Sequence, residues 1–192
     1  MNSEYFFKSD IGNALKTQQG IYCLEQPLFR KDGKRIFKIG YARDSLYKRV
    51  RDYKTAYSVM PFTIHLLWAV PEKVVHKRAN FALLTETIIH KSLYQECAMK
   101  DEDYKQNGEW FYEIKKIIAT IKNIQEGYIY EGVKNADKWL FWINPEYENV
   151  ATRKTTRAIA SEKNVSSKLK DLTVKDRVEF NREATKRDYK EE

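Results

Sequence analysis

Two apolar runs near the amino terminus predict an antiparallel hairpin. Residues 20–25 (GIYCLE) and 35–42 (RIFKIGYA) are rich in β-branched and aromatic side chains, and the turn pair Asp32-Gly33 lies in the segment that joins them. Two runs connected by a glycine-bearing loop are typical of paired strands. The pattern therefore predicts two adjacent strands, each with side chains alternating between the two faces of a sheet.

A helix, a strand and a second helix are expected further along. Asp44 or Ser45 is expected to cap a helix that runs to about residue 57, because apolar positions then recur at helical spacing. Residues 62–70 (FTIHLLWAV) are nearly all apolar, which is typical of a strand covered on both sides. A long helix over about residues 72–95 is expected after Pro71.

The composition changes at about residue 126, which predicts two regions. Residues 1–125 carry 21 basic and 14 acidic side chains, a net charge of +7, whereas residues 126–192 carry 14 and 13, a net charge of +1. Most of the chain's net charge of +8 therefore belongs to the first region. A positive field of this kind favours a polyanionic partner such as nucleic acid.

Other features of the sequence limit the function classes. Cys23 and Cys97 have neither the spacing of metal ligands nor that of a disulfide framework, which favours a reducing compartment. The amino-terminal residues lack the pattern of a signal peptide, and no segment approaches the roughly 20 apolar residues of a membrane span. We expect an intracellular, soluble protein, in the cytoplasm or with the nucleoid or nucleus.

Glu86 interrupts the apolar stripe of the long helix expected over residues 72–95. The stripe consists of Val75, Ala79, Ala82, Ile89 and Leu93. Glu86 fills the gap of seven residues between Ala82 and Ile89. An ionised carboxylate on an apolar face is costly unless a cation or a guanidinium compensates it. The alternative is a carboxylate at the edge of the stripe that reaches water or a nearby lysine.

Arg49 and Tyr53 are expected on one face of the first long helix, because they are four residues apart. An arginine beside a phenol suits the paired hydrogen bonds of phosphate binding, although a surface arginine lying along its helix is also common. In the hairpin, Tyr22 and Lys38 are expected side by side on one sheet face. Lys38 could be a solvent-reaching residue, but Gly40 on the same face is expected to leave open space for a substrate backbone.

These residues, in this order, resemble the GIY-YIG nuclease superfamily over about residues 18–113. The elements that carry the resemblance are GIY at 20–22, KIG at 38–40, Arg49 and Tyr53 on a helix, Glu86 on a later helix, and the segment NGEWF at 107–111. The second motif has Lys38 where the family name expects tyrosine, and some restriction-type members resemble this sequence there. Asn107 resembles a late asparagine of the family and is a possible supporting residue.

The resemblance implies an α+β fold with a small three-stranded antiparallel sheet flanked by helices. It also implies a metal-dependent DNA endonuclease in which Glu86 holds one divalent ion, Mg²⁺, whose coordination is completed by phosphate and water oxygens. Arg49 and the metal would neutralise the transition state. Tyr22 or Lys38 would be the general base, and Tyr53 would orient the phosphate or that base.

Two other functions are weighed against this one. The main alternative is a nucleic-acid-binding module of the same fold that does not cleave. A cysteine hydrolase built on Cys23 is disfavoured, because this side chain is expected on the face opposite Tyr22 and in the core. Residues 151–170 hold six basic residues and one acidic residue. Three of them, Arg153, Lys154 and Arg157, are expected to contact nucleic acid, most favourably duplex DNA, unless the segment is an ordinary solvated helix.

Overall fold

The computed structural model describes residues 1–28, 30–56, 62–71, 80–97 and 109–150. The chain divides into two units, Met1–Arg153 and Lys154–Glu192, and the described residues all belong to the first. The elements in chain order are α1 Ser3–Phe6, α2 Asp10–Ala14, β1 Gly20–Glu25, β2 Arg30–Lys31, β3 Lys34–Arg35, β4 Phe37–Ala42, α3 Leu46–Ala56, β5 Thr63–Ala69, α4 Phe81–Cys97, β6 Trp110–Phe111, α5 Ile114–Tyr130, η1 Ala136–Lys138, β7 Phe141–Ile143 and η2 Pro145–Tyr147.

A five-stranded antiparallel sheet forms the centre of the fold, in the order β6-β4-β1-β5-β7, and β2 and β3 form a separate two-stranded ribbon. The α+β class is as expected, but the prediction of a small three-stranded sheet is wrong. The three long strands β4, β1 and β5 are extended by β6 on one side and β7 on the other. These outer strands have two and three residues, which is too short for an alternating pattern to be visible in the sequence.

The hairpin predicted over residues 20–42 is confirmed. β1 and β4 pair antiparallel, with Tyr22 opposite Gly40 and Leu24 opposite Lys38. On its other side β1 pairs with β5, so β1 is the middle strand. All six residues of β1 are buried, which explains its nearly continuous apolar character.

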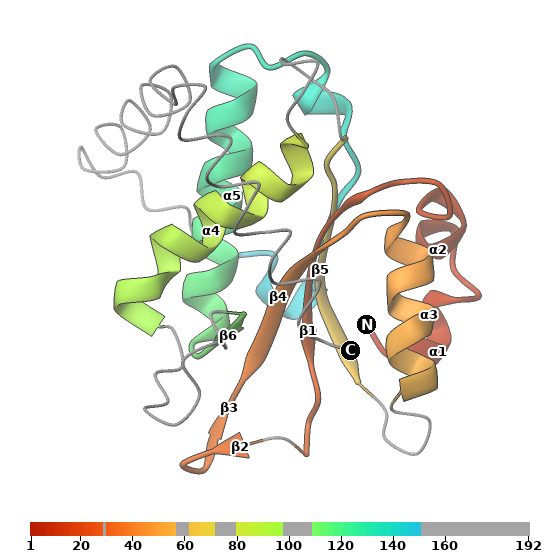
Figure 1. The fold of residues 1–192 in the computed structure, drawn as a ribbon, viewed down its shortest axis with the longest axis vertical. Coiled ribbons are helices and arrows are strands. Elements are labelled where there is room, and N and C mark those ends of the chain that lie inside the picture. Colours follow the sequence, from red (N-terminus) through yellow and green to blue (C-terminus); the bar gives the residue numbers. More distant parts are fainter. Residues whose placement is uncertain (29, 57–61, 72–79, 98–108, 151–192) are drawn as a thin grey trace. The chain divides into compact units, whose positions relative to one another are not determined.

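Helices cover both faces of the sheet, with α1, α2 and α3 on one side and α4 and α5 on the other (Figure 1). The core on the α3 side includes Tyr22, Leu46, Val50 and Leu67. Because side chains alternate along β1, Cys23 lies on the opposite face from Tyr22, and it is completely buried. Its predicted place in the core is confirmed.

The helix caps set where the two middle helices begin. The N–H of Lys48 donates to Ser45 Oγ at 3.0 Å, so Ser45 caps α3. The side-chain oxygen of Asn80 likewise accepts from the N–H of Leu83 at 3.0 Å, and α4 begins at Phe81. The single helix predicted from residue 72 is therefore wrong at Asn80, where a capping side chain starts a new helix. Residues 72–79, with Val75 and Ala79, lie outside the described residues.

A buried ion-pair cluster ties the β2–β3 ribbon to the main sheet. Glu25, at the end of β1, accepts two hydrogen bonds from the Arg35 guanidinium at 2.8 and 2.6 Å. Arg30 approaches the same carboxylate at 3.4 Å, and His65 Nε2 lies 2.9 Å from it. Burial tends to raise the pKa of Glu25, but Arg35 and His65 outweigh it and hold the pKa at about 2. We refer to Glu25, Arg30, Arg35 and His65 as the anchor cluster.

The end of the described segment continues this fold. α5 runs through residue 125, and β7 adds to the sheet by pairing with β5, with Leu66 opposite Ile143. The predicted division into a nuclease domain (1–125) and an extension (126–192) remains a prediction about function. Within the described ranges, no helix combines the length and the apolar character that crossing a membrane requires.

Candidate active site

Tyr22 and Tyr53 form the centre of the candidate site. Tyr22 points from β1 toward α3, and its hydroxyl lies 3.1 Å from the hydroxyl of Tyr53. The two rings meet edge to face, with centroids 5.8 Å apart. Tyr22 is almost completely buried, whereas Tyr53 is only partly buried. The inner phenol is thus held by the outer one, which lies closer to solvent.

Gly40 provides the space that the Tyr22 ring occupies. A Cβ atom at Gly40 would lie 2.4 Å from the Tyr22 hydroxyl oxygen and 2.7 Å from the ring carbon that bears it. No side chain at position 40 could therefore coexist with Tyr22 in this orientation. The expectation that Gly40 leaves space for a substrate backbone is wrong, because the tyrosine of the neighbouring strand fills it.

Lys38 reaches the same group from β4. Its Nζ lies 2.9 Å from Glu109 Oε2 and 5.7 Å from the centroids of both the Tyr53 and the Trp110 rings. The ammonium group thus lies between a carboxylate and two aromatic faces, an environment that favours its charged form. Burial lowers the pKa of Lys38, but Tyr53 and Glu109 outweigh it, and the pKa ends above its ordinary value.

Tyr22 is also held in its protonated form. Burial, reinforced by the neighbouring Tyr53, raises the pKa of Tyr22 well above its ordinary value, and Arg49 offsets only part of this. Near neutral pH the site therefore presents a neutral phenol at Tyr22 and an ammonium at Lys38.

Arg49 adds a second cation. It lies on α3 one turn before Tyr53, and its side chain is exposed. Desolvation lowers the pKa of Arg49, but Tyr22 and Tyr53 outweigh it and raise the pKa. The guanidinium thus lies near both phenols, with its donors accessible from solvent. Arg51 is exposed as well.

Glu86 lies beside β4 rather than within the tyrosine group. It is half-buried on α4, and its Oε1 accepts a hydrogen bond of 3.1 Å from the N–H of Tyr41. Tyr41 follows Gly40 along β4, on the side of the strand where the Ile39 N–H donates to the Glu109 carbonyl. The buried part of the expected stripe is present at Ala82, Ile89 and Leu93.

The structure brings together Tyr22, Lys38, Arg49 and Tyr53, and it adds a residue that the sequence analysis did not select. Glu109, which pairs with Lys38, also acts electrostatically on Tyr22 and Arg49. The signal for it was its place in the NGEWF segment, next to the residues that form β6. The predicted supporting residue Asn107 and the predicted contact residues Arg153, Lys154 and Arg157 lie outside the described residues.

Comparison with known proteins adds the family. A family model, the T5orf172 domain, matches residues 19–144. The chain belongs to the T5orf172 domain family. This domain is found in endonuclease-like proteins of phages and mobile elements. Neither the curated proteins nor the solved structures compared with the chain gave a match.

The T5orf172 match coincides with the main sheet. It starts one residue before β1 and ends one residue after β7. All five of the predicted residues Tyr22, Lys38, Arg49, Tyr53 and Glu86 lie within it. The matched domain therefore contains both the complete five-stranded sheet and the candidate site.

The metal-binding capacity of the T5orf172 domain depends on Glu86. No group of three or more His, Cys, Asp or Glu side chains that could hold a metal ion occurs in the part of the chain that the structure describes. Mg²⁺ commonly retains several waters and uses one or two carboxylates together with substrate phosphates. One amide hydrogen bond does not exhaust the roughly four lone-pair sites of a carboxylate. Glu86 therefore fits a Mg²⁺ ion held jointly with a substrate.

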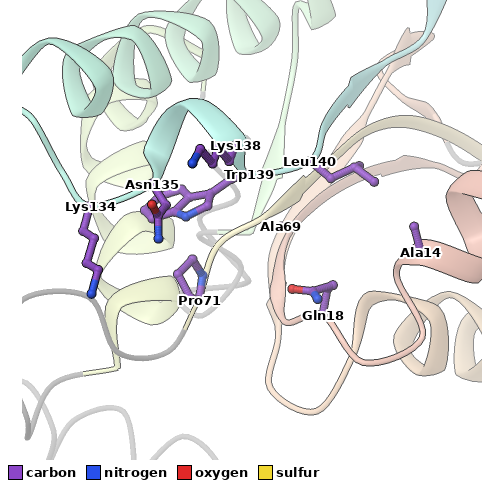
Figure 2. A pocket seen from close by; sticks show the side chains of 9 residues that line it. All are labelled: Ala14, Gln18, Ala69, Pro71, Lys134, Asn135, Lys138, Trp139 and Leu140. Carbon is purple, nitrogen blue, oxygen red and sulfur yellow. The ribbon is translucent and has the colours of Figure 1, made fainter.

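A pocket of about 610 Å³ lies at the opposite side of the strand order from the candidate site. Figure 2 shows Gln18 and Ala14 on one side of it and Trp139, Lys134 and Lys138 on the other. No residue of the tyrosine group lines it. The candidate site is therefore an open surface at β4 and α3, which suits a polymer substrate better than a small molecule.

Proposed function

We propose that this protein is a metal-dependent endonuclease that hydrolyses phosphodiester bonds in double-stranded DNA, with a site of the GIY-YIG type. The observation that supports this most directly is the convergence of Tyr22, Lys38, Arg49 and Tyr53 at one accessible place. A core tyrosine pair needs neither an ammonium nor a guanidinium beside it. Two cations next to hydroxyl donors are, in contrast, what binding of a phosphodiester requires.

The roles follow from the geometry of the four side chains. Arg49 offers paired donors from an exposed position, and Lys38 offers a point charge that the neighbouring aromatic rings leave accessible. Both would bind the scissile phosphate and neutralise charge as it develops in the transition state. Tyr53, bonded to Tyr22, would donate to a phosphate oxygen or orient the water. The net charge of +7 on residues 1–125 would attract the DNA.

Glu86 would hold the Mg²⁺ ion. When bound, the ion would supply a positive charge at the phosphate and lower the energy of the transition state. In the ion's absence the carboxylate accepts the N–H of Tyr41, which fixes its position beside β4. That hydrogen bond orients the ligand before the substrate arrives, as pre-organised sites require.

A plasmid-cleavage assay with and without Mg²⁺ tests the proposal. Wild-type protein is expected to nick or linearise the plasmid only with the metal. Glu86→Ala and Glu86→Gln are expected to reduce cleavage by at least about 10³-fold, because the proposed metal ligand is removed. DNA binding at low salt should persist in both variants, since the cationic residues that carry affinity are intact.

The outcomes separate the two candidate functions. Metal-dependent cleavage that disappears in the Glu86 variants supports the nuclease. Tight DNA binding without cleavage by the wild type, over a range of divalent ions, would instead identify a nucleic-acid-binding module. Cleavage by Glu86→Ala at the wild-type rate would remove Glu86 from the site.

A further inference from the structure

We propose that Glu109 is the general base of the reaction, the group that accepts the proton of the attacking water. This inference rests on the proposed nuclease function. It is carried by three observations: the place of the carboxylate among the other site residues, its accessibility to water, and the chemical state of its neighbours.

The backbone holds Glu109 firmly beside Lys38. Its carbonyl oxygen accepts the N–H of Ile39 at 2.9 Å, and the next residue, Trp110, pairs with Lys38 where β6 meets β4. The carboxylate then bonds the Lys38 ammonium at 2.9 Å. A side chain anchored at both its backbone and its head is positioned before substrate binds, which favours a role in chemistry.

Water has access to this carboxylate. The Glu109 side chain is 50% exposed, whereas that of Lys38 is 23% exposed and Tyr22 is 3% exposed. A general base must reach the proton that it removes, directly or through one water. Glu109 lies on the solvent side of the group, where water can meet a phosphate bound by Lys38 and Arg49.

The two other candidate bases are protonated in this environment. Burial raises the pKa of Tyr22, and its hydroxyl is bonded to that of Tyr53. Lys38 is held as an ammonium by Tyr53 and Glu109, although burial alone would lower its pKa. A base must start the reaction without its proton. In the tyrosine group and its immediate surroundings, Glu109 is the side chain that meets this condition.

The step balances as follows. The water oxygen forms a bond to phosphorus while one of its protons passes to the Glu109 carboxylate. The bond between phosphorus and the leaving ester oxygen breaks, and the resulting alkoxide takes a proton from solvent. The protonated Glu109 then returns its proton to bulk water. Lys38 and Arg49 keep their charges throughout and neutralise the phosphate oxygens.

Single-turnover cleavage of a duplex by Glu109→Gln tests this role. The amide keeps the size and a hydrogen-bonding oxygen but cannot accept a proton at neutral pH. The cleavage rate at saturating DNA and Mg²⁺ is expected to fall by about 10²–10⁴-fold. The Kd for DNA, measured with Ca²⁺ in place of Mg²⁺, should stay within a few fold or tighten, because a negative charge is lost. Glu109→Asp should retain more activity than Glu109→Gln.

Lys38→Met distinguishes a base from a residue that only positions Lys38. If Glu109 acted solely through Lys38, adding Glu109→Gln to Lys38→Met would cause no further loss of rate. We expect the double variant to be at least about 10-fold slower than Lys38→Met alone. Asp44→Asn is the matched control, since Asp44 is an exposed carboxylate that also pairs with a lysine; its rate should equal that of the wild type.

Two results would overturn the inference while leaving the nuclease in place: a Glu109→Gln rate within about threefold of an active wild type, or no additional loss in the Lys38→Met background. A wild type that binds DNA but never cleaves it would overturn the proposed function, and the base with it. The two failures are therefore distinguishable.

Discussion

Two carboxylate–cation groups lie on the hairpin of β1 and β4, and they differ in how completely their charges are enclosed. In the anchor cluster the Glu25 side chain is 4% exposed and accepts paired hydrogen bonds from Arg35. In the tyrosine group the Glu109 side chain is 50% exposed, and its bond to Lys38 is a single contact. The same type of ion pair thus occurs once as a saturated, buried connection and once as an accessible contact.

The difference separates structure from chemistry. A buried carboxylate with three cationic neighbours has little capacity left for a ligand, and its loss leaves charges unpaired. An accessible pair can exchange its partner for a phosphate or a water at small cost, because solvent already screens it. The comparison predicts that substitutions in the anchor cluster change stability, whereas substitutions in the tyrosine group change the reaction.

Arg49→Lys should have the largest effect of the remaining tests. A lysine cannot reproduce the paired donors of the guanidinium. The cleavage rate at saturating DNA should fall by about 10²–10³-fold, typical of one lost transition-state contact. The melting temperature should change little, because Arg49 is exposed. Arg51→Lys, two residues along the helix, is the matched control and should be silent in the same assay; the reverse pattern would contradict the assigned helix face.

Glu25→Gln should affect stability and spare the reaction. The unfolding free energy should fall by about 2–3 kcal/mol, somewhat less than for a fully buried pair because Arg35 can be hydrated after the change. Urea denaturation measures the loss, and the cleavage rate per folded molecule should be unchanged. Asp44→Asn, which breaks an exposed pair with Lys48, should cost less than about 1 kcal/mol. Equal losses in the two variants would contradict the distinction.

The pH dependence of stability sharpens the same test. The pKa of Glu25 in the folded state is about 2, below the usual value of about 4.3 for an unfolded chain. The stabilisation from its ionised form is therefore complete above that usual value and is lost as the pH falls toward 2. Between about pH 5 and 2 the wild type should lose more stability than Glu25→Gln, and parallel curves would show that Glu25 does not carry this dependence.

The smallest effect on either group is expected from the basic segment beyond the described residues. Replacing Arg153, Lys154 and Arg157 together by alanine should leave the folded state and the rate at saturating DNA unchanged. If each contacts a phosphate, the slope of log K against log salt should decrease by roughly 0.9 per residue on duplex DNA. Affinity measured at several salt concentrations checks this, and an unchanged slope would make the segment an ordinary surface.

Local patterns predicted the parts of the fold that depend on neighbouring residues. Alternation and the glycine-bearing loop indicated the β1–β4 hairpin, and helical spacing after Ser45 indicated α3. β6 and β7 escaped detection because two or three residues carry no period, and their pairing partners are far away in the sequence. The three-stranded expectation failed for this reason, as strand pairing at the sheet edges depends on tertiary contacts.

The site was predictable to a similar extent. Tyr22, Lys38, Arg49 and Tyr53 could be selected because strand alternation and helix spacing set their faces. Glu109 could not, because its role arises from the pairing of Trp110 with Lys38, across a long sequence separation. The filling of the space at Gly40 was likewise invisible, since the pattern gives the face of Tyr22 but not the reach of its ring.

The hydrogen bond between Glu86 and the Tyr41 N–H has a consequence for solubility. β6 pairs with β4 at Phe37 and Lys38, and Tyr41 lies further along that edge, where Glu86 accepts its N–H. An unpaired strand edge is a template for the strand of another molecule, and inward charges discourage such pairing. Replacing Glu86 by alanine therefore removes an acidic guard as well as a metal ligand, whereas Glu86→Gln retains an acceptor for the edge. Self-association of the alanine variant, and not of the glutamine variant, would show that the carboxylate keeps molecules apart.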